Sequence, residues 1–316
     1  MKEILLLLVM FWNVENYFDT YNDPLKNDDA FTPMGENYWT KEKFNKKRDA
    51  IAKTIMLAAD SYGMFPALVG LCEVENSFVL NQLLERTPLA RAGYRYIHRE
   101  SPDSRGIDVA LLYREDIFTP LETRVIGVSF PTRDILYTKG VVNGLDTLHV
   151  FVNHWPSKSG GEEATAWRRM AVARKVKVVT DSLLVANPRA NILFMGDLND
   201  ARSSESVSYL SPELINLTVW SHGGDGSYKY KGNWETIDHF LVSGNLLERG
   251  EGTIPRWIYC KKGMEIFAHD YLLCEDPTYS GVKPHRTLQG PRHLGGVSDH
   301  LPIILEFYTP TVGQNP

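Results

Sequence analysis

The sequence has few cysteines, little net charge and no long apolar segment. Its 316 residues include three cysteines, Cys72, Cys260 and Cys274. Three cysteines cannot form a disulfide framework, and no CxxC spacing indicates a zinc site. A Cys260–Cys274 disulfide remains an alternative, but we expect three buried or incidental thiols. The 34 basic and 39 acidic residues give a formal charge of −5, which argues against a strongly basic protein that wraps duplex nucleic acid. An enzyme with a local basic groove is not excluded.

The apolar run Ile4–Trp12 is too short to span a bilayer, which takes about 20 residues. Together with Lys2 it resembles the start of a signal peptide, but no small-x-small cleavage site follows it. We therefore interpret this run as a buried first strand and expect no transmembrane segment. The localisation stays unknown: cytoplasmic from the sequence as given, and periplasmic or secreted if an export signal was trimmed from a longer precursor.

Hydrophobic residues make up 43% of the chain and charged residues 23%, which allows a sizeable core and excludes global disorder. Short apolar runs rich in β-branched residues predict buried strands. They are Ile4–Trp12, Ala67–Leu71, Val109–Tyr113, Leu148–Val152, Ile192–Met195, Phe240–Val242 and Pro302–Phe307. Helical spacing of apolar residues predicts helices over Thr40–Ala59 and Glu162–Val185. A shorter helix through Leu84 is predicted to begin with Ser77 as its N-cap.

Helices and strands alternate along the whole length, which favours a layered α/β or α+β architecture. No internal repeat, low-complexity tract or linker interrupts the pattern, so one domain over residues 1–316 is the simplest organisation. Three segments rich in glycine or proline are expected to be surface loops: Ser157–Gly161, His222–Gly226 and Gly281–Gly296.

Polar side chains stand at one end of six of these strand-like runs. They are Asn13 and Glu15, Glu73, Asn153 and His154, Asp197 and Asn199, Asp238, and Asp299 with His300. A carboxylate beside buried aliphatic residues is costly unless it is paired or binds a metal. Any one of these residues alone fits a helix cap or a turn, but six such strand ends make repeated coincidence a poor explanation. Oxygen ligands without cysteine indicate Mg²⁺ or Mn²⁺ rather than zinc, and histidines beside such a cation fit hydrolysis of a phosphate ester.

At these residues the chain resembles the endonuclease/exonuclease/phosphatase superfamily, which includes apurinic endonucleases, pancreatic-type deoxyribonucleases, inositol polyphosphate 5-phosphatases and neutral sphingomyelinases. The matching segments occur in the order of that family and span residues 13–303. They are NVEN (13–16), CEVEN (72–76), RGIDVALLY (105–113), VNHWPSKSGG (152–161), GDLND (196–200), IDHFLVS (237–243) and SDHLPI (298–303). The resemblance implies a four-layer α/β sandwich, with two mixed β-sheets packed face to face, helices outside and the active site at one end of the strands.

The resemblance also implies a mechanism, which is in-line attack of water on phosphorus assisted by Mg²⁺ or Mn²⁺. Glu73 would be the main metal ligand. Three further residues would lie near the metal shell: Asn13, Glu15 and Asp299.

The remaining catalytic roles also follow from the resemblance. Asp197 would orient or deprotonate the attacking water, and Asn199 would donate hydrogen bonds to the phosphate. His300, oriented and kept cationic by Asp238, would contact the phosphate or transfer a proton, and His154 would donate to the phosphate or the leaving group. Whether Asp197 or a histidine is the base stays open.

Several residues are candidates for substrate binding, each beside a structural alternative. Arg105 and Arg133 would clamp phosphate or form ordinary ion pairs, and Lys158 would bind phosphate or cap the next helix. Tyr230 and Trp234, in a segment that interleaves aromatic and basic residues, would stack on a base or sugar, or form a plain β-edge. Asn153 completes the set, and residues 281–296 form either a substrate-shaping lid or a connection to the last strand.

These observations lead to three hypotheses for function. The first is a metal-dependent phosphodiesterase acting on nucleic acid, and the second is a phosphatase or diesterase for a small phosphorylated molecule or lipid headgroup. The third, a catalytically dead binding module, is disfavoured because the residues of the implied site are intact. The net charge disfavours tight duplex binding, no stable protein partner is implied, and we expect a monomer.

Overall fold

The first strand, β1 (Glu3–Tyr17), lies inside a sheet, as predicted for the apolar run Ile4–Trp12. The computed structural model describes residues 3–247, 258–260 and 263–310. Strand β1 pairs in parallel with β2 (Leu68–Val74) and antiparallel with β20 (Ile303–Pro310). Consecutive residues such as Phe11 and Trp12 point to opposite faces of the sheet and both are fully buried, so both faces of β1 are covered.

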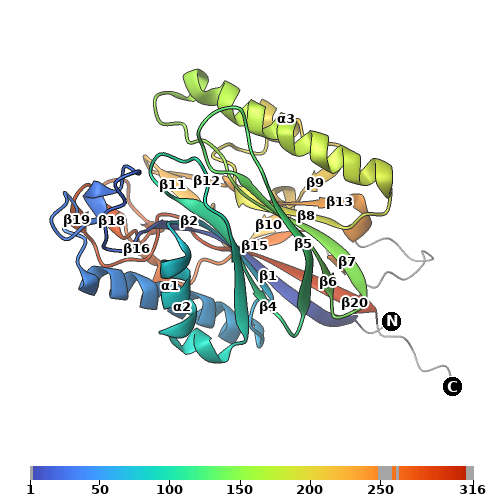
Figure 1. Ribbon diagram of the computed structural model, residues 1–316, viewed down its shortest axis with the longest axis horizontal. Coiled ribbons are helices and arrows are strands. Elements are labelled where there is room, and N and C mark those ends of the chain that lie inside the picture. Colours follow the sequence, from blue (N-terminus) through green and yellow to red (C-terminus); the bar gives the residue numbers. More distant parts are fainter. Residues whose placement is uncertain (1–2, 248–257, 261–262, 311–316) are drawn as a thin grey trace.

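Two large mixed sheets contain most of the described strands (Figure 1). The first has the order β10-β15-β20-β1-β2-β4-β3, with β14 also pairing with β20. Its further members are β3 (Tyr94–His98), β4 (Asp108–Arg114), β10 (Ser221–His222), β14 (Tyr259–Cys260) and β15 (Met264–Ile266). The second sheet has the order β5-β6-β7-β8-β13-β9. Its members are β5 (Phe118–Ile126), β6 (Ile135–Val142), β7 (Asp146–His154), β8 (Ile192–Asp197), β9 (Leu214–Asn216) and β13 (Asp238–Ser243).

The second sheet packs on both of its faces, which follows from the alternation of side chains along its strands. In β7 and β8, Val150, Val152 and Met195 join the core that also holds β1 and β2. The intervening Phe151 and Phe194 pack on the opposite side in a separate core. The two sheets therefore lie face to face, and the outer face of the second sheet needs a cover.

Four α-helices are described, and the three long ones cover the outer faces of the sheets. They are α1 (Lys41–Tyr62), α2 (Ser77–Glu85), α3 (Glu162–Ala186) and the single-turn α4 (Glu205–Ser208). Helix α3 packs Val172 and Val176 on the second sheet, whereas α1 and α2 belong to the core of the first. Figure 1 shows α3 on one side of the sandwich and α1 with α2 on the other. The protein is thus a four-layer α/β sandwich, as the sequence predicted.

Some local predictions differ from the structure. The N-cap of α2 is Asn76 rather than Ser77: the Asn76 side chain accepts a hydrogen bond from the backbone N–H of Val79 at 3.1 Å. Asparagine and serine are equally good caps, so the sequence did not separate the two positions. Residues 281–296 are not an unpaired loop. They contribute to two short ladders, β16 (Leu273–Glu275) with β17 (Val282–Pro284), and β18 (Leu288–Gln289) with β19 (Arg292–His293).

Three further predictions concern the position of the strands and helices, the cysteines and membrane-spanning helices. The strands and long helices occupy the predicted segments. Residues 222–226 were expected to form a loop, but the first of them, His222, belongs to β10 and pairs with Glu265 of β15. All three cysteines are free, as expected. Among the helices in the described part of the chain, none is long and apolar enough to cross a membrane. The single domain over residues 1–316 stays a prediction.

The topology brings the polar strand ends to one edge of the sandwich. Strands β1 and β2 run parallel, as do β7 and β8, so the carboxyl ends of each pair meet. Strands β13 and β20 run antiparallel to β8 and β1, so their amino ends reach the same edge. The register places Asp197 between His154 on β7 and Asp238 on β13.

The close approach of the two sheets yields a prediction about Gly70 of β2. A Cβ at this position would lie 2.6 Å from the Met195 sulfur of β8, across the interface between the sheets. Gly70→Val should lower the free energy of unfolding by about 1–3 kcal/mol through overpacking, as measured by urea denaturation. Combined with Met195→Ala, it should cost less than the sum of the two single substitutions. Strict additivity would contradict this packing.

Candidate functional site

A cleft of about 1140 Å³ opens at the edge where the polar strand ends meet. Most of the residues singled out from the sequence line it: Asn13, Glu15, Glu73, Arg105, Arg133, His154, Lys158, Asp197, Asn199, Tyr230, Asp299 and His300. The other three, Asn153, Asp238 and Trp234, lie behind or beside this lining. The structure therefore brings the candidates together, and their individual roles stay predictions.

The backbone at the base of the cleft adopts conformations that are uncommon outside glycine. Glu15, Asn16, Glu73 and Asn199 have positive φ angles of 50°, 55°, 61° and 51°. Short hydrogen bonds to site side chains hold three of these residues. The N–H groups of Glu15, Asn16 and Asn199 donate to Asn13 Oδ1 at 2.9 Å, Glu73 Oε2 at 2.8 Å and Asp197 Oδ1 at 2.9 Å. Strained backbone of this kind concentrates at functional sites.

A buried chain of polar groups runs from Ser227 through Asp238 and His300 to Asp197. The Ser227 hydroxyl donates to Asp238 Oδ2 at 2.6 Å, and the same oxygen lies 2.8 Å from His300 Nδ1. The other ring nitrogen, Nε2, lies 3.8 Å from Asp197 Oδ2. Burial lowers the pKa of His300, but the charges of Asp238 and Asp197 outweigh burial and raise this pKa well above its usual value. His300 is therefore a cation whose Nε2 faces the cleft.

His154 differs from His300 in its partners and in the direction of its pKa shift. Its Nε2 lies 3.7 Å from Asp197 Oδ2 and 4.0 Å from Glu73 Oε1. Its Nδ1 is buried and has no hydrogen-bond partner among the described residues. Burial, together with the positive charges of Arg133 and Arg105, lowers the pKa of His154 well below the usual value. The cleft thus holds one cationic and one neutral imidazole.

Asp197 is the carboxylate that both histidines face. It is 1% exposed, and it accepts hydrogen bonds from Asn13 Nδ2 at 3.0 Å and from the backbone of Asn199. Burial raises the pKa of Asp197 to about 7; the His300 charge opposes this shift, and Asp238 adds to it. A carboxylic acid that titrates near neutral pH suits proton transfer.

The residues around Glu73 fit a divalent cation. Glu73 Oε2 accepts the Asn16 N–H, whereas Oε1 has only a long contact of 3.5 Å with Asn13 Nδ2 among its described hydrogen-bond partners. Asp197 and Asp299 bring further carboxylates to the same cleft. Carboxylates crowded in a partly buried site repel one another, and a cation relieves that repulsion. An all-oxygen donor set of this kind suits Mg²⁺ or Mn²⁺, and the roles of Glu73 as the main ligand and of Asn13, Glu15 and Asp299 near the metal shell stay predictions.

Glu15 holds a wall of the cleft. Its carboxylate accepts hydrogen bonds from the Arg286 guanidinium at 3.2 Å, from Thr287 N at 2.6 Å and from Leu288 N at 3.4 Å. Arg286 also pairs with Asp299 at 3.1 Å. Burial and the charge of Asp299 raise the pKa of Glu15 to about 7. The described contacts of Glu15 thus connect it to residues 281–296, the segment for which the sequence left a lid or a connection to the last strand open.

The basic residues of the cleft are largely paired. Arg133 donates to Asp103 at 3.1 Å and to the Trp155 carbonyl at 2.7 Å. Lys158 lies 2.8 Å from Glu162 in an i,i+4 ion pair, but it does not cap the helix: the N-cap of α3 is Gly161, without a side-chain hydrogen bond. Arg105 is half exposed, and its guanidinium lies 4.0 Å from Asp103.

The aromatic segment at 228–234 forms a two-stranded ladder, β11 (Tyr228–Tyr230) with β12 (Asn233–Glu235). Tyr230 is exposed and lines the cleft, whereas Trp234 packs against the core with the Lys229 ammonium over its face. The Tyr228 ring lies against the His300 imidazole at a centroid distance of 4.9 Å. Tyr228 and Tyr230 therefore line the cleft, whereas Trp234 does not.

Sequence reasoning missed several supporting residues. Asp103 anchors Arg133, Ser227 anchors Asp238, and the Ser298 hydroxyl donates to the Asn13 carbonyl at 2.6 Å. Each acts across a long sequence separation, so no local pattern marks it; only Ser298, inside the SDHLPI segment, carried a signal. Asn153 is fully buried, and its amide donates to the Met195 carbonyl at 3.4 Å.

One family model and several solved structures match this chain. A family model described as "Endonuclease/Exonuclease/phosphatase family" matches residues 8–309. No curated protein matches the sequence at a significant level. Among solved structures, an endonuclease/exonuclease/phosphatase family protein from Bacteroides thetaiotaomicron is 18% identical with a TM-score of 0.60, covering 98% of this chain and 100% of its own.

Two further solved structures share the fold. A mannosyl-6-phosphatase from Bacteroides thetaiotaomicron is 16% identical with a TM-score of 0.59, covering 95% of this chain and 99% of its own. The human Nocturnin catalytic domain, solved with a bound sulfate anion, is 15% identical with a TM-score of 0.57, covering 98% and 97%. At these identities the likeness concerns the fold.

The two histidines should titrate differently, which NMR of metal-free protein can measure. We expect the His300 pKa to lie well above, and the His154 pKa well below, that of an ordinary histidine, in line with the directions of their pKa shifts. Asp238→Asn removes the largest charge that raises the His300 pKa, so this pKa should fall. His149, which contacts Tyr137 instead, serves as the control and should not move. An unchanged His300 pKa in Asp238→Asn would refute the assignment.

Proposed function

This chain belongs to the endonuclease/exonuclease/phosphatase family, whose members are metal-dependent phosphoesterases, and we propose that it hydrolyses a phosphate ester of a small molecule with Mg²⁺ as the cation. The activity class follows from the family. The observation that carries the choice of substrate is the balance of charge in the cleft.

Acidic side chains outnumber basic ones in the lining of the cleft. The acidic set is Glu15, Glu73, Asp103, Glu162, Asp197, Glu235 and Asp299, and the basic set is Arg105, Arg133, Lys158, Arg168 and the His300 imidazolium. Arg133 and Lys158 already form ion pairs with carboxylates. A nucleic-acid backbone needs a row of free Lys and Arg side chains to neutralise successive phosphates. One phosphate group bound beside a single cation does not, and this supports a small substrate.

A nucleic-acid substrate remains the second candidate because of the size of the cleft. Its volume of about 1140 Å³ lies above the range of roughly 300–1,000 Å³ typical of pockets for drug-sized ligands. Tyr230, which is 52% exposed, offers an aromatic face on which a base would stack.

The mechanism that we propose is hydrolysis by in-line attack of water on phosphorus. A bound cation supplies positive charge to the phosphate oxygens. Asp197 lies between both histidines, where it accepts the proton of the attacking water or, if a histidine is the base, orients that water. The His300 imidazolium, His154 and Asn199 are the hydrogen-bond donors to the phosphate, and the His300 imidazolium gives its proton to the leaving oxygen as the phosphorus–oxygen bond breaks. Asp238 keeps His300 charged and oriented.

Substitution of the central carboxylates tests the activity. Glu73→Gln and Asp197→Asn should each lower the Mg²⁺-dependent kcat by about 10²–10⁴-fold on a phosphate-ester substrate such as a nitrophenyl phosphate. Glu213→Gln, which alters a surface ion pair with Lys177, is the matched control and should retain activity. Rates near that of the wild type in both site variants would exclude this mechanism.

The choice of substrate class can be tested by its dependence on salt. For a small phosphorylated substrate such as a sugar phosphate or inositol phosphate, kcat/KM should change little between 50 and 200 mM salt. Binding of DNA or RNA should be weak at both concentrations, because few cations are free to displace counterions. A nuclease would instead bind the polymer tightly and lose affinity steeply as salt rises, and that result would favour the second candidate.

A further inference from the structure

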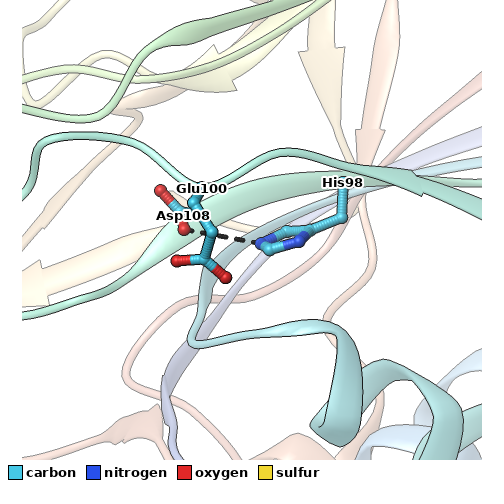
Figure 2. A group of neighbouring side chains, drawn as sticks. All are labelled: His98, Glu100 and Asp108. Atoms are coloured by element: carbon cyan, nitrogen blue, oxygen red, sulfur yellow. Dashed lines mark ion pairs between the residues drawn. The ribbon is translucent and has the colours of Figure 1, made fainter. Parts of the chain in front are cut away.

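A second group of ligand-type side chains lies outside the cleft, at the base of the loop between β3 and β4. It consists of His98, Glu100 and Asp108, and we call it the β3–β4 cluster (Figure 2). Ligand atoms from all three residues lie within 4.8 Å of one another. None of the three belongs to the lining of the cleft formed by the described residues.

Strand register explains why these residues meet. Strands β3 and β4 are antiparallel, with Ile97 opposite Leu111 and His98 opposite Ala110. Continued by two residues, this register sets position 100 opposite position 108. Residues two apart along a strand share a face, so the three side chains point into one space, as Figure 2 shows. Strand β3 lies at the end of the sheet order, which leaves Glu100 open to solvent.

The two buried members of the β3–β4 cluster lack ordinary partners. Asp108 is 1% exposed and His98 8% exposed. Within the described part of the chain, neither carboxylate oxygen of Asp108 nor Nε2 of His98 has a hydrogen bond. The imidazole and the carboxylate face each other at 3.4 Å, which is longer than a strong charged hydrogen bond. A buried carboxylate without donors is costly, and a coordinated cation would remove that cost.

The charges around the β3–β4 cluster agree with this picture. Burial, the charge of Asp108 and a hydrogen bond that a protonated Glu100 would make to Asp108 raise the pKa of Glu100, so the two carboxylates lie close enough to share a proton or a cation. Lys26 is the nearby cation, but its ammonium donates to the carbonyl oxygens of Ser101 and Asp103 rather than to either carboxylate. Among the described residues, the His98 ring is therefore the group that faces the Asp108 carboxylate, and no Lys or Arg side chain donates to it.

We propose that His98, Glu100 and Asp108 form a second metal site, separate from the catalytic centre, that binds a transition-metal cation of the Zn²⁺ type. An imidazole nitrogen with two carboxylates suits Zn²⁺ better than Mg²⁺, which prefers oxygen ligands alone. Three protein ligands leave a coordination position for water on the exposed side of Glu100.

The position of the site gives the ion a structural consequence. The segment between His98 and Asp108 carries Asp103 and Arg105, both of which line the cleft. Asp103 in turn holds Arg133. A cation that joins the two ends of this segment would fix one wall of the cleft, although it lies outside the cleft itself.

Equilibrium dialysis of the metal-stripped, full-length protein against Zn²⁺ tests the proposal. The wild type should bind Zn²⁺ at the β3–β4 cluster, and His98→Gln and Glu100→Gln should each weaken this binding at least about tenfold. Glu73→Gln, which alters the cleft, should keep it. Glu115→Gln changes an exposed glutamate at the other end of the same strand pair, where it contacts Arg95, and is the matched control that should bind like the wild type.

A second measurement follows the ligand directly. Zn²⁺ should shift the NMR resonances of the His98 ring in the wild type and in Glu73→Gln, an excess of Mg²⁺ should not prevent the shift, and a chelator should reverse it. Glu100 is exposed, so we expect Glu100→Gln to fold. If His98→Gln does not fold, Zn²⁺ binding by Glu100→Gln decides whether the proposed site exists. Zn²⁺ binding by Glu100→Gln equal to that of the wild type, or a His98 ring that does not respond, would overturn the proposal. The three residues would then share a proton rather than a metal.

Discussion

The repulsion among carboxylates buried at one edge of the sandwich is the constraint on which the rest of the site depends. Strand register sets Asp238 opposite Asp197 in the second sheet, and the packing of the two sheets brings Glu73, near the end of β2, to the same cleft as Asp197. The protein offsets this repulsion with the His300 imidazolium, with amide donors such as Asn13 and, by our inference, with a divalent cation. Strained backbone at Glu73 and Asn199 supports the same arrangement.

The fold and most of the cleft were predictable from the sequence. Strands such as Ile192–Met195 and the face of α3 with Val172 and Val176 follow from local hydrophobic patterns, because burial imposes those patterns on neighbouring residues. The prediction that the polar strand ends form one site came from the order of the family motifs in the sequence. Contacts between distant loops were not predictable: Ser227 with Asp238, or Arg286 with both Glu15 and Asp299, leave no trace in local sequence.

The same reasoning explains why the β3–β4 cluster escaped the sequence analysis. His98 ends the short edge strand β3, Glu100 follows it in the loop, and Asp108 lies inside the motif that was used to place Arg105. Only the register of β3 on β4 brings the three together. The cleft and the proposed second site therefore share one physical principle, in which carboxylates crowded together in a buried place are stabilised by a cation.

We infer that the polar strand ends of the two sheets meet around a cation held by Glu73. Anomalous diffraction from crystals grown with Mn²⁺ and inorganic phosphate tests it most directly. We expect a manganese peak in contact with the Glu73 carboxylate, and a phosphate between that peak and His154, Asn199 and His300. A crystal at saturating Mn²⁺ with no anomalous density at Glu73 would contradict the account.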